Sequence, residues 1–351
     1  MSDGAAGASP PRPTSALQAE ALSGGVLPPA ERVRERTWSL ALPVGERPLD
    51  ATLAYLLEGD GGELALVDPG WGEGDALGRL RAAVSATGHD LADVGLVVAT
   101  HLHADHLGAA EAVRRATGAR VALHALDAEA DRWLGDRPAT AEADLARWGV
   151  PADELPALRD SWVVGGAVTS VVPDLLLGDG DLLPLTGRAV RCTWTPGHTA
   201  GHLCLTDPEG GLVLTGDHVL PHVNPGIGLG GPGPGDPVSD VLASLERVAD
   251  LDDGSVEVAP GHGYRFRGLR ARSEALSVHR LARDDAAARA LDALAGRHGA
   301  TAPTVWELAS RLPWTGGFTA LHGATLGSAL AQTAWHVAHL GRGDELHDAD
   351  G

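Results

Sequence analysis

Short apolar runs recur along the chain and end in Gly, Pro or Asp residues that are typical of turns. Eight runs have the length and residue types of β-strands, at 51–59, 62–70, 94–100, 119–125, 189–197, 201–207, 211–217 and 255–261. Helical apolar spacing follows at 75–87, 107–117, 238–250 and 269–297. The strands first follow one another directly and then alternate with helices. This order predicts a layered α/β (α+β) domain in which helices cover sheets.

Three further segments differ from this strand pattern. Residues 127–170 have acidic amphipathic helical patterns and predict a helical insert, which either shapes a pocket or is a plain surface excursion. The run 224–237 has too much Gly and Pro for regular structure, so it is a mobile loop at a site mouth or a neutral linker. Near the end of the chain, Thr304 and Glu307 have capping-box spacing and predict a helix start. A second helical pattern ends at Gly341, which indicates a small helical appendage for packing or assembly.

These patterns divide the chain into an N-terminal arm (1–35), a main domain (36–268), a long helix with the appendage (269–345) and a tail (346–351). The arm is rich in Gly, Ala, Ser and Pro and lacks the basic start and apolar middle of a signal peptide. We therefore expect it to be disordered, on a cytoplasmic protein without a membrane span. The two cysteines, too few for a disulfide framework, agree with a reducing compartment.

Charge narrows the choice of partner. The 351 residues have a formal net charge of −20, and a field of that sign repels phosphate backbones. The C-terminal appendage is acidic as well. Nucleic acid is therefore an unfavourable partner, although a local basic groove can still exist, and we expect a small-molecule substrate. The sequence leaves homo-oligomerisation open.

The stretch "THLHADH" places three histidines and an aspartate directly after an apolar strand, at His101, His103, Asp105 and His106. Imidazole and carboxylate groups are ligands for borderline and hard divalent metals. The cluster offers two pairs of ligands and cannot complete two coordination spheres alone. A metal site here needs donors from elsewhere in the chain.

Three later residues provide such donors: His198, Asp217 and His262 each follow the end of an apolar strand. Taken singly, a histidine after Pro-Gly is commonly a turn residue and an aspartate in "TGD" is commonly a cap. Taken together with the first cluster, their order and their shared position at strand ends favour a metal site.

Five motifs over roughly 50–265 resemble those of the metallo-β-lactamase superfamily: "LVDPG" with Asp68, "THLHADH", "PGHTAGH", "TGD" and "PGHG". The resemblance implies a four-layer αβ/βα sandwich with two metals at the edge of the sheets. It assigns His101, His103 and His198 to one metal, Asp105, His106 and His262 to the other, and Asp217 to both. Asp68 then supports the histidine loop without binding metal. The tail resembles the winged-helix-like C-terminal domain of the β-lactamase-like protein 2 branch.

The chemistry of such a site is hydrolysis. Two divalent ions about 3.5–4 Å apart lower the pKa of a shared water and hold the resulting hydroxide as nucleophile, while Asp105 or Asp217 can take up a proton. Zinc is the expected metal, and iron or manganese accept the same donors. We favour a small ester or thioester as substrate, as in glyoxalase II relatives. The alternative is a metal-dependent endoribonuclease, followed by hydrolysis of a lactone or aryl ether.

Five residues near the expected ligands have less certain roles. His202, His218 and His222 are interpreted as supporting or structural groups because the ligand set is already full. Tyr264 and Arg265 follow His262 closely. They either contact anionic groups of the substrate or pack under the long helix.

Overall fold

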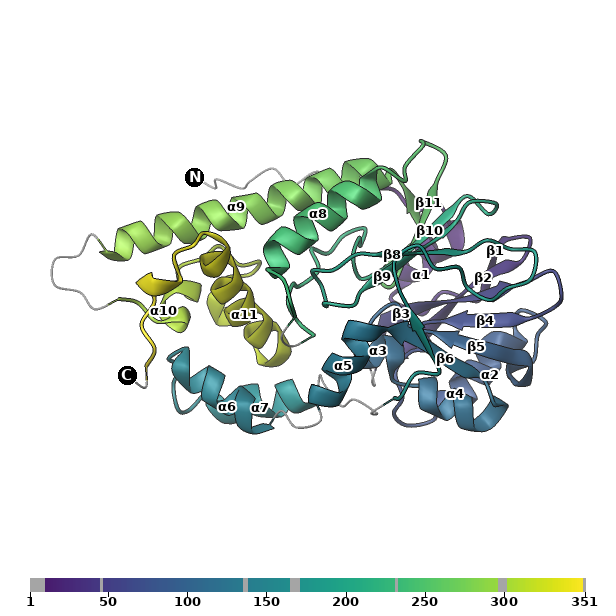
Figure 1. The fold of residues 1–351 in the computed structure, drawn as a ribbon, viewed down its shortest axis with the longest axis horizontal. Coiled ribbons are helices and arrows are strands. Elements are labelled where there is room, and N and C mark those ends of the chain that lie inside the picture. The colour runs from purple at the N-terminus through teal and green to yellow at the C-terminus, as the bar shows by residue number, and fades with distance from the viewer. Residues whose placement is uncertain are drawn as a thin grey trace.

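The computed structural model of the chain describes residues 10–44, 47–134, 138–164, 171–230, 233–295 and 302–349. Two β-sheets face each other, and helices cover both outer sides (Figure 1). The first sheet follows the chain order: β1 (Glu31–Arg34), β2 (Thr37–Val44), β3 (Arg47–Glu58), β4 (Leu64–Val67), β5 (Val94–Val98), β6 (Arg120–His124) and β7 (Leu175–Leu177). The second sheet has the order β12 (Phe266–Arg267), β11 (Glu257–Pro260), β10 (Leu212–Gly216), β9 (Leu203–Asp207) and β8 (Arg191–Trp194).

Strand direction follows the connections. Strands β1 to β4 pair antiparallel, as a direct meander requires, whereas β4 to β7 pair parallel because helices connect them. In the second sheet β10 and β11 are parallel, and the other pairs are antiparallel. The eight strands expected from the apolar runs correspond to β3–β6 and β8–β11. The apolar runs did not indicate β1, β2, β7 and β12.

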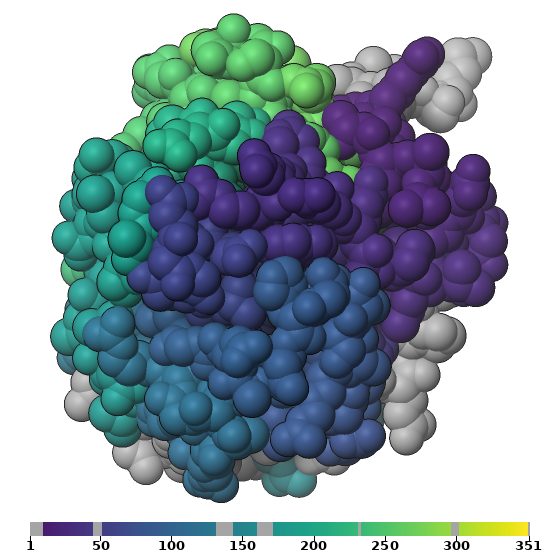
Figure 2. Space-filling model, turned by 90° about the vertical axis from the view of Figure 1, so that its right-hand side faces the viewer, coloured from purple at the N-terminus to yellow at the C-terminus, as the bar shows by residue number. Residues whose placement is uncertain are grey.

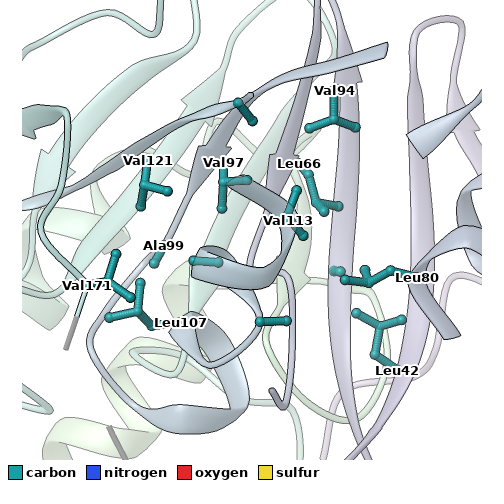
Figure 3. Packing of buried hydrophobic residues seen from close by; sticks show 14 of the residues in the cluster. Leu42, Leu66, Leu80, Val94, Val97, Ala99, Leu107, Val113, Val121 and Val171 are labelled. Atoms are coloured by element: carbon teal, nitrogen blue, oxygen red, sulfur yellow. The ribbon is translucent and has the colours of Figure 1, made fainter. Parts of the chain in front are cut away.

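Three apolar cores separate the four layers. Helices α2 (Ala76–Ser85) and α4 (Ala110–Thr117) pack Leu80 and Val113 onto Leu66 and Val97 of the first sheet (Figure 3). A second core lies between the sheets. On the far side, α8 (Pro237–Ala249) and α9 (Leu269–Ala295) pack onto the second sheet. Strand β10 shows why, because successive side chains alternate: Leu212 and Leu214 join the central core, and Val213 joins the outer one. The predicted αβ/βα sandwich is confirmed.

The N-terminal residues differ from the predicted disordered arm. Within 10–35 the chain forms α1 (Ala16–Gly24) and β1, and the Ser15 hydroxyl caps α1 by accepting a hydrogen bond from Gln18 N. Gln18 and Ala21 are buried. The composition, rich in Gly, Ala, Ser and Pro, suggested disorder, but polar contacts to distant strands order the segment. The first nine residues of the predicted arm lie outside the described ranges.

A helical lobe adjoins the sandwich. It combines the described parts of the predicted insert, α5 (Ala125–Leu134), α6 (Pro138–Arg147) and α7 (Leu155–Val164), with α10 (Val305–Ala309) and α11 (Gly323–His339) (Figure 1). Leu145 and Leu158 share an apolar core with Val305 and Leu330. The capping box of Thr304 and Glu307 is present at the start of α10.

Shorter elements complete the chain: α3 (Ala104–Leu107), η1 (Leu91–Asp93), η2 (Phe318–Ala320) and η3 (Gly343–Glu345). In the part of the C-terminal region that the structure describes, no strand follows β12, so the winged-helix-like topology stays a prediction. None of the described helices combines the length and the apolar character needed to cross a bilayer.

Candidate metal centre

The expected ligands converge because each follows the carboxyl end of a strand at one edge of the sandwich. The loop with His101, His103, Asp105 and His106 follows β5 in the first sheet. In the second sheet, His198 follows β8, Asp217 follows β10 and His262 follows β11. The structure brings all seven residues into one cluster, formed by three overlapping groups whose donor atoms lie within 4.8 Å of one another.

Three imidazoles form one half of the cluster. The Nδ1 atom of His103 lies 2.9 Å from Nε2 of His101 and 3.1 Å from Nε2 of His198. The side chains of His101 and His198 are almost fully buried. Three ring nitrogens therefore point at one small volume from three directions, as tetrahedral metal sites require.

The other half combines imidazoles with carboxylates. The Nε2 atom of His262 lies 3.2 Å from Nε2 of His106 and 3.2 Å from Oδ2 of Asp105. Asp217 lies between the halves: its Oδ1 is 3.4 Å from His106 Nε2, and its Oδ2 is 3.6 Å from His198 Nε2. Each oxygen of Asp217 thus faces a different half.

The outer nitrogens of the rings are held by acceptors. His198 Nδ1 donates to the Gly226 carbonyl at 2.7 Å, and His262 Nδ1 donates to the Ala51 carbonyl at 2.8 Å. His106 Nδ1 donates to Asp68 at 2.9 Å. Such contacts fix the tautomer and leave the inner nitrogen with a free lone pair, as in metal-binding histidines.

Electrostatics separate the halves. Burial lowers the pKa of His198 to about 3 and moves the pKa values of His101 and His103 in the same direction, so these rings are neutral. Burial also lowers the pKa of His106, but the carboxylates of Asp217 and Asp105 outweigh it and raise the pKa to about 10. The second half therefore concentrates negative charge that needs a cation.

Two local features show that the cluster fits a divalent cation. The Oδ1 atom of Asp217 is buried and has no hydrogen-bond partner among the described residues, which is costly for a carboxylate unless a cation compensates it. Gly261 lines the same space: an added Cβ would lie 2.6 Å from that oxygen and 2.7 Å from Cε1 of His106. The donor set of imidazole nitrogens and carboxylate oxygens suits zinc, iron or manganese.

Asp68 is placed where the resemblance puts it, behind the histidine loop. Its carboxylate accepts hydrogen bonds from Thr100 N at 2.7 Å and the Thr100 hydroxyl at 2.9 Å, besides the one from His106. With φ at 55°, it is the only non-glycine residue with positive φ in the described ranges. We infer that this conformation lets one carboxylate reach both the backbone and the ring.

Asp127 is a supporting residue that the sequence did not reveal. It is fully buried, and its carboxylate accepts from Leu102 N at 2.9 Å, the Thr199 hydroxyl at 2.8 Å and Gly201 N at 2.6 Å. Burial raises the pKa of Asp127 to about 6 despite these hydrogen bonds. One side chain thereby ties the loop between His101 and His103 to the loop after His198.

The loop at 225–229 supports the histidine half from outside. Besides Gly226, Leu229 contributes a carbonyl 3.5 Å from His103 Nε2, and its N–H donates to the His198 carbonyl at 3.0 Å. Arg280 of α9, almost fully buried, donates to the Pro225 carbonyl and to Gln332 of α11. The C-terminal helices therefore fix part of the predicted 224–237 loop.

The remaining candidates have structural contacts. His202 is buried, bonds the Thr195 hydroxyl through Nδ1 at 2.8 Å and accepts from Asp217 N at 3.2 Å. His218 is buried, and His222 stacks on Tyr264. The interpretation of these three histidines as supporting groups agrees with these contacts.

The structure does not favour substrate contact for Tyr264 and Arg265. The Tyr264 hydroxyl donates to the Pro11 carbonyl at 2.7 Å. The buried guanidinium of Arg265 pairs with Glu31 at 2.6 Å and Glu257 at 2.9 Å. Both side chains hold the N-terminal segment in place, because Pro11 and Glu31 of that segment accept their hydrogen bonds.

Comparison with known proteins agrees with this geometry. The profile of the "Metallo-beta-lactamase superfamily" matches residues 47–262, which contain every residue of the cluster. The chain belongs to the metallo-beta-lactamase superfamily. Its fold is also that of a metallo-beta-lactamase family protein from Thermus thermophilus, with a TM-score of 0.70 and 31% identity over 88% of this chain and 94% of the other.

Two curated relatives in this superfamily have named activities. The acyl-coenzyme A thioesterase MBLAC2 of Homo sapiens is 33% identical over 194 residues, which cover 50% of this chain and 58% of that protein. A hydroxyacylglutathione hydrolase of Ectopseudomonas mendocina (strain ymp) is 30% identical over 206 residues, or 59% of each chain. The chain thus spans somewhat more than half the length of these relatives.

A pocket of about 430 Å³ opens over the cluster. Asp105, His198, Asp217 and His262 line it on one side. The rest of the described lining is mostly apolar and comes from the N-terminal segment, the end of β2, β3, the 220–226 loop and Gly263. The volume is in the range of small-molecule sites.

Asp127→Asn is expected to weaken metal binding or kcat/KM by about 10- to 100-fold, as is typical when a residue that orients ligands is changed. The amide replaces one oxygen by an N–H donor, which then faces either the Gly201 N–H or the donors of Leu102 and Thr199. Competition with a chelator measures the metal affinity. Asp179→Asn is the control, because Asp179 bonds Trp194 N and Arg247 outside the cluster. Wild-type affinity and kcat/KM in Asp127→Asn would contradict the supporting role.

Proposed function

We propose that this chain is a metal-dependent hydrolase of small ester or thioester substrates. His101, His103 and His198 would hold one ion, and Asp105, His106 and His262 would hold a second, with Asp217 shared between the two sites. Zinc is the proposed metal. The ions would supply a water of lowered pKa and polarise the carbonyl oxygen of the substrate. The named activities of the two relatives, both thioester hydrolases, support the reaction class.

The lining of the pocket is the observation that favours a small acyl substrate over RNA. No arginine or lysine is among its described lining residues, and its ionisable groups are the carboxylates of Asp105 and Asp217 and the imidazoles of His198, His222 and His262. A site for a phosphodiester chain needs cations along the backbone path. This lining, together with the net charge of −20, makes the endoribonuclease alternative unfavourable.

The chain's own residues have distinct roles in this proposal. Asp105 and Asp217 reach the pocket from the cluster, so either carboxylate can accept a proton from the attacking water and return it to the leaving group. Hydrogen bonds at the outer nitrogens of His106, His198 and His262 orient these rings so that their inner nitrogens face the cluster. The apolar lining offers a contact surface for the rest of the substrate.

Substrate profiling of the purified, metal-loaded protein tests the proposal. We expect hydrolysis of at least one thioester or ester, loss of that activity with a chelator and recovery when zinc is added. Single-stranded RNA should neither bind at physiological salt nor be cleaved. A lactone and an aryl ether complete the panel.

The opposite result is equally clear. RNA binding that weakens steeply with salt, together with metal-dependent cleavage that is lost in His262→Ala, would establish the nuclease alternative. Turnover of acyl substrates that survives complete metal removal would reject the metal-dependent mechanism.

A further inference from the structure

The N-terminal segment supplies one wall of the pocket over the cluster. Leu22, Val26, Leu27 and Pro28, which we call the N-terminal wall, line the same pocket as Asp217 and His262. In Figure 2 this segment, in purple, lies beside the green segment that follows β11. The profile match begins only at residue 47, so the wall lies outside the matched part of the chain.

Polar contacts attach this segment to the second sheet. Thr14 N donates to the Arg265 carbonyl at 2.8 Å, and Arg265 N donates to Gln18 at 2.9 Å. The Ser15 hydroxyl bonds Glu31 at 2.6 Å. Together with the contacts of Tyr264 and of the Arg265 guanidinium, these bonds attach α1 to β1 and to the segment just before β12. The N-terminal wall is therefore held in a defined position at the pocket.

The end of α1 explains how the wall residues come together. Gly25, with φ at 64°, ends the helix in a left-handed conformation that suits glycine. Its N–H donates to Leu22 O, and Val26 N donates to Ala21 O at 3.0 Å, which is a Schellman motif. The chain turns back sharply there, so Leu22 and Val26 both reach the pocket.

The wall residues leave apolar surface uncovered. Leu22 is 41% exposed and Val26 is 58% exposed, and Val223 on the 220–226 loop is 45% exposed. All three line the pocket. Exposed large apolar side chains that gather beside a polar cluster are typical of ligand sites, where a few polar groups orient a mostly apolar ligand.

We propose that the N-terminal wall binds the apolar acyl chain of the substrate and makes the site selective for longer acyl groups. The inference deepens the proposed function and rests on it. The acyl carbonyl lies at the cluster, between Asp105, Asp217 and His262. The hydrocarbon chain extends from there along Leu22 and Val26 on one side and Val223 on the other.

Chain-length profiles test the wall. Each buried methylene strengthens binding about fourfold, so octanoyl thioesters should have at least about a tenfold higher kcat/KM than acetyl thioesters, even on a wall open to solvent. Leu22→Asp and Val26→Asp place a charge in the path of the chain. They should lower the octanoyl-to-acetyl ratio of kcat/KM by about tenfold, mainly through KM.

Leu17→Asp is the matched control. Leu17 lies on the same helix and is 44% exposed, but it does not line the pocket. This variant should keep the wild-type ratio, and thermal denaturation with metal analysis verifies that the other variants stay folded and loaded. An octanoyl-to-acetyl ratio near one in the wild type, or an unchanged ratio in both wall variants, overturns the proposal.

A binding measurement tests whether the N-terminal wall binds an acyl chain, independently of whether the protein hydrolyses acyl substrates. Hexanamide and acetamide, which present the same head group, are titrated calorimetrically into the metal-loaded protein. Hexanamide should bind about tenfold more tightly, and Leu22→Asp should remove the difference. If no acyl substrate is hydrolysed, the proposed function fails, and equal binding of the two amides rejects the wall independently.

Discussion

Replacing Asp217 with asparagine is expected to lower kcat/KM for the best acyl substrate by about 10³-fold or more. The two oxygens of Asp217 face different halves of the cluster, at 3.4 Å from His106 and 3.6 Å from His198. An amide offers one oxygen and one NH₂ group, so one half meets a donor in place of an acceptor. Burial raises the pKa of Asp217, but His262 and His106 outweigh it and hold the pKa well below its usual value. The substitution therefore removes a negative charge that the cluster uses to balance its cationic groups.

The size of this effect distinguishes a shared ligand from a supporting group, for which about 10- to 100-fold is typical. Steady-state kinetics on the metal-loaded variant measures it, and circular dichroism verifies the fold, since the two side chains have the same shape. Asp240→Asn, on α8 outside the cluster, is the control and should retain wild-type kinetics. Activity of Asp217→Asn within tenfold of the wild type would show that the carboxylate does not bridge.

The double variant His101→Ala, His103→Ala is expected to reduce the bound metal from about two equivalents per chain to about one. These rings supply two of the three inner nitrogens of the histidine half, and one ring with a shared carboxylate makes a poor site. Elemental analysis of protein prepared without chelator measures the metal content. The thermal midpoint should fall as well, because an ion that binds only the folded chain stabilises it.

His89→Ala is the control for metal content. His89 packs edge-on against Trp38 and bonds Thr87, away from the cluster, so this variant should keep about two equivalents. Two equivalents in the double histidine variant, or none in the wild-type protein, would be incompatible with the proposed ligand sets.

The strands and the expected ligands were predictable because their signals are local. An apolar run such as 94–98 predicts a strand that is buried on both faces of its sheet, and the turn residues after it show where the strand ends. Parallel and adjacent strands then bring their carboxyl ends together, so His106 and His262 meet although 156 positions separate them. Strand β7 was missed because only three residues pair, and two of them are not buried.

The N-terminal segment could not be predicted because its order comes from distant partners. Thr14 bonds Glu257, which lies 243 positions away, and Pro11 accepts from Tyr264, 253 positions away. Neither end of these pairs has a local pattern that indicates the other. Tyr264 and Arg265 were left with two interpretations for the same reason, since the sequence near His262 does not show which groups satisfy them.

Asp127 illustrates the same limit inside the site. Its neighbours have an ordinary acidic helical pattern, and only the fold brings the backbone of Leu102 and Gly201 to its carboxylate. The spacing of motifs does not reveal supporting residues of this kind, although it does reveal the expected metal ligands that they hold in place.

The contact between Arg280 and Pro225 joins two parts of the molecule that differ in character. A guanidinium buried without a carboxylate partner in the described chain has a large desolvation cost, so its contacts with the Pro225 carbonyl and the Gln332 amide are strongly retained. The 225–229 loop that it holds also receives the outer nitrogens of His103 and His198. By thermodynamic reciprocity, a cation bound at those rings favours the docked state of α9 and α11 as much as the docked helices favour the cation. Amide hydrogens in α9 and α11 should then exchange with solvent more slowly in the metal-loaded protein than in the metal-free protein.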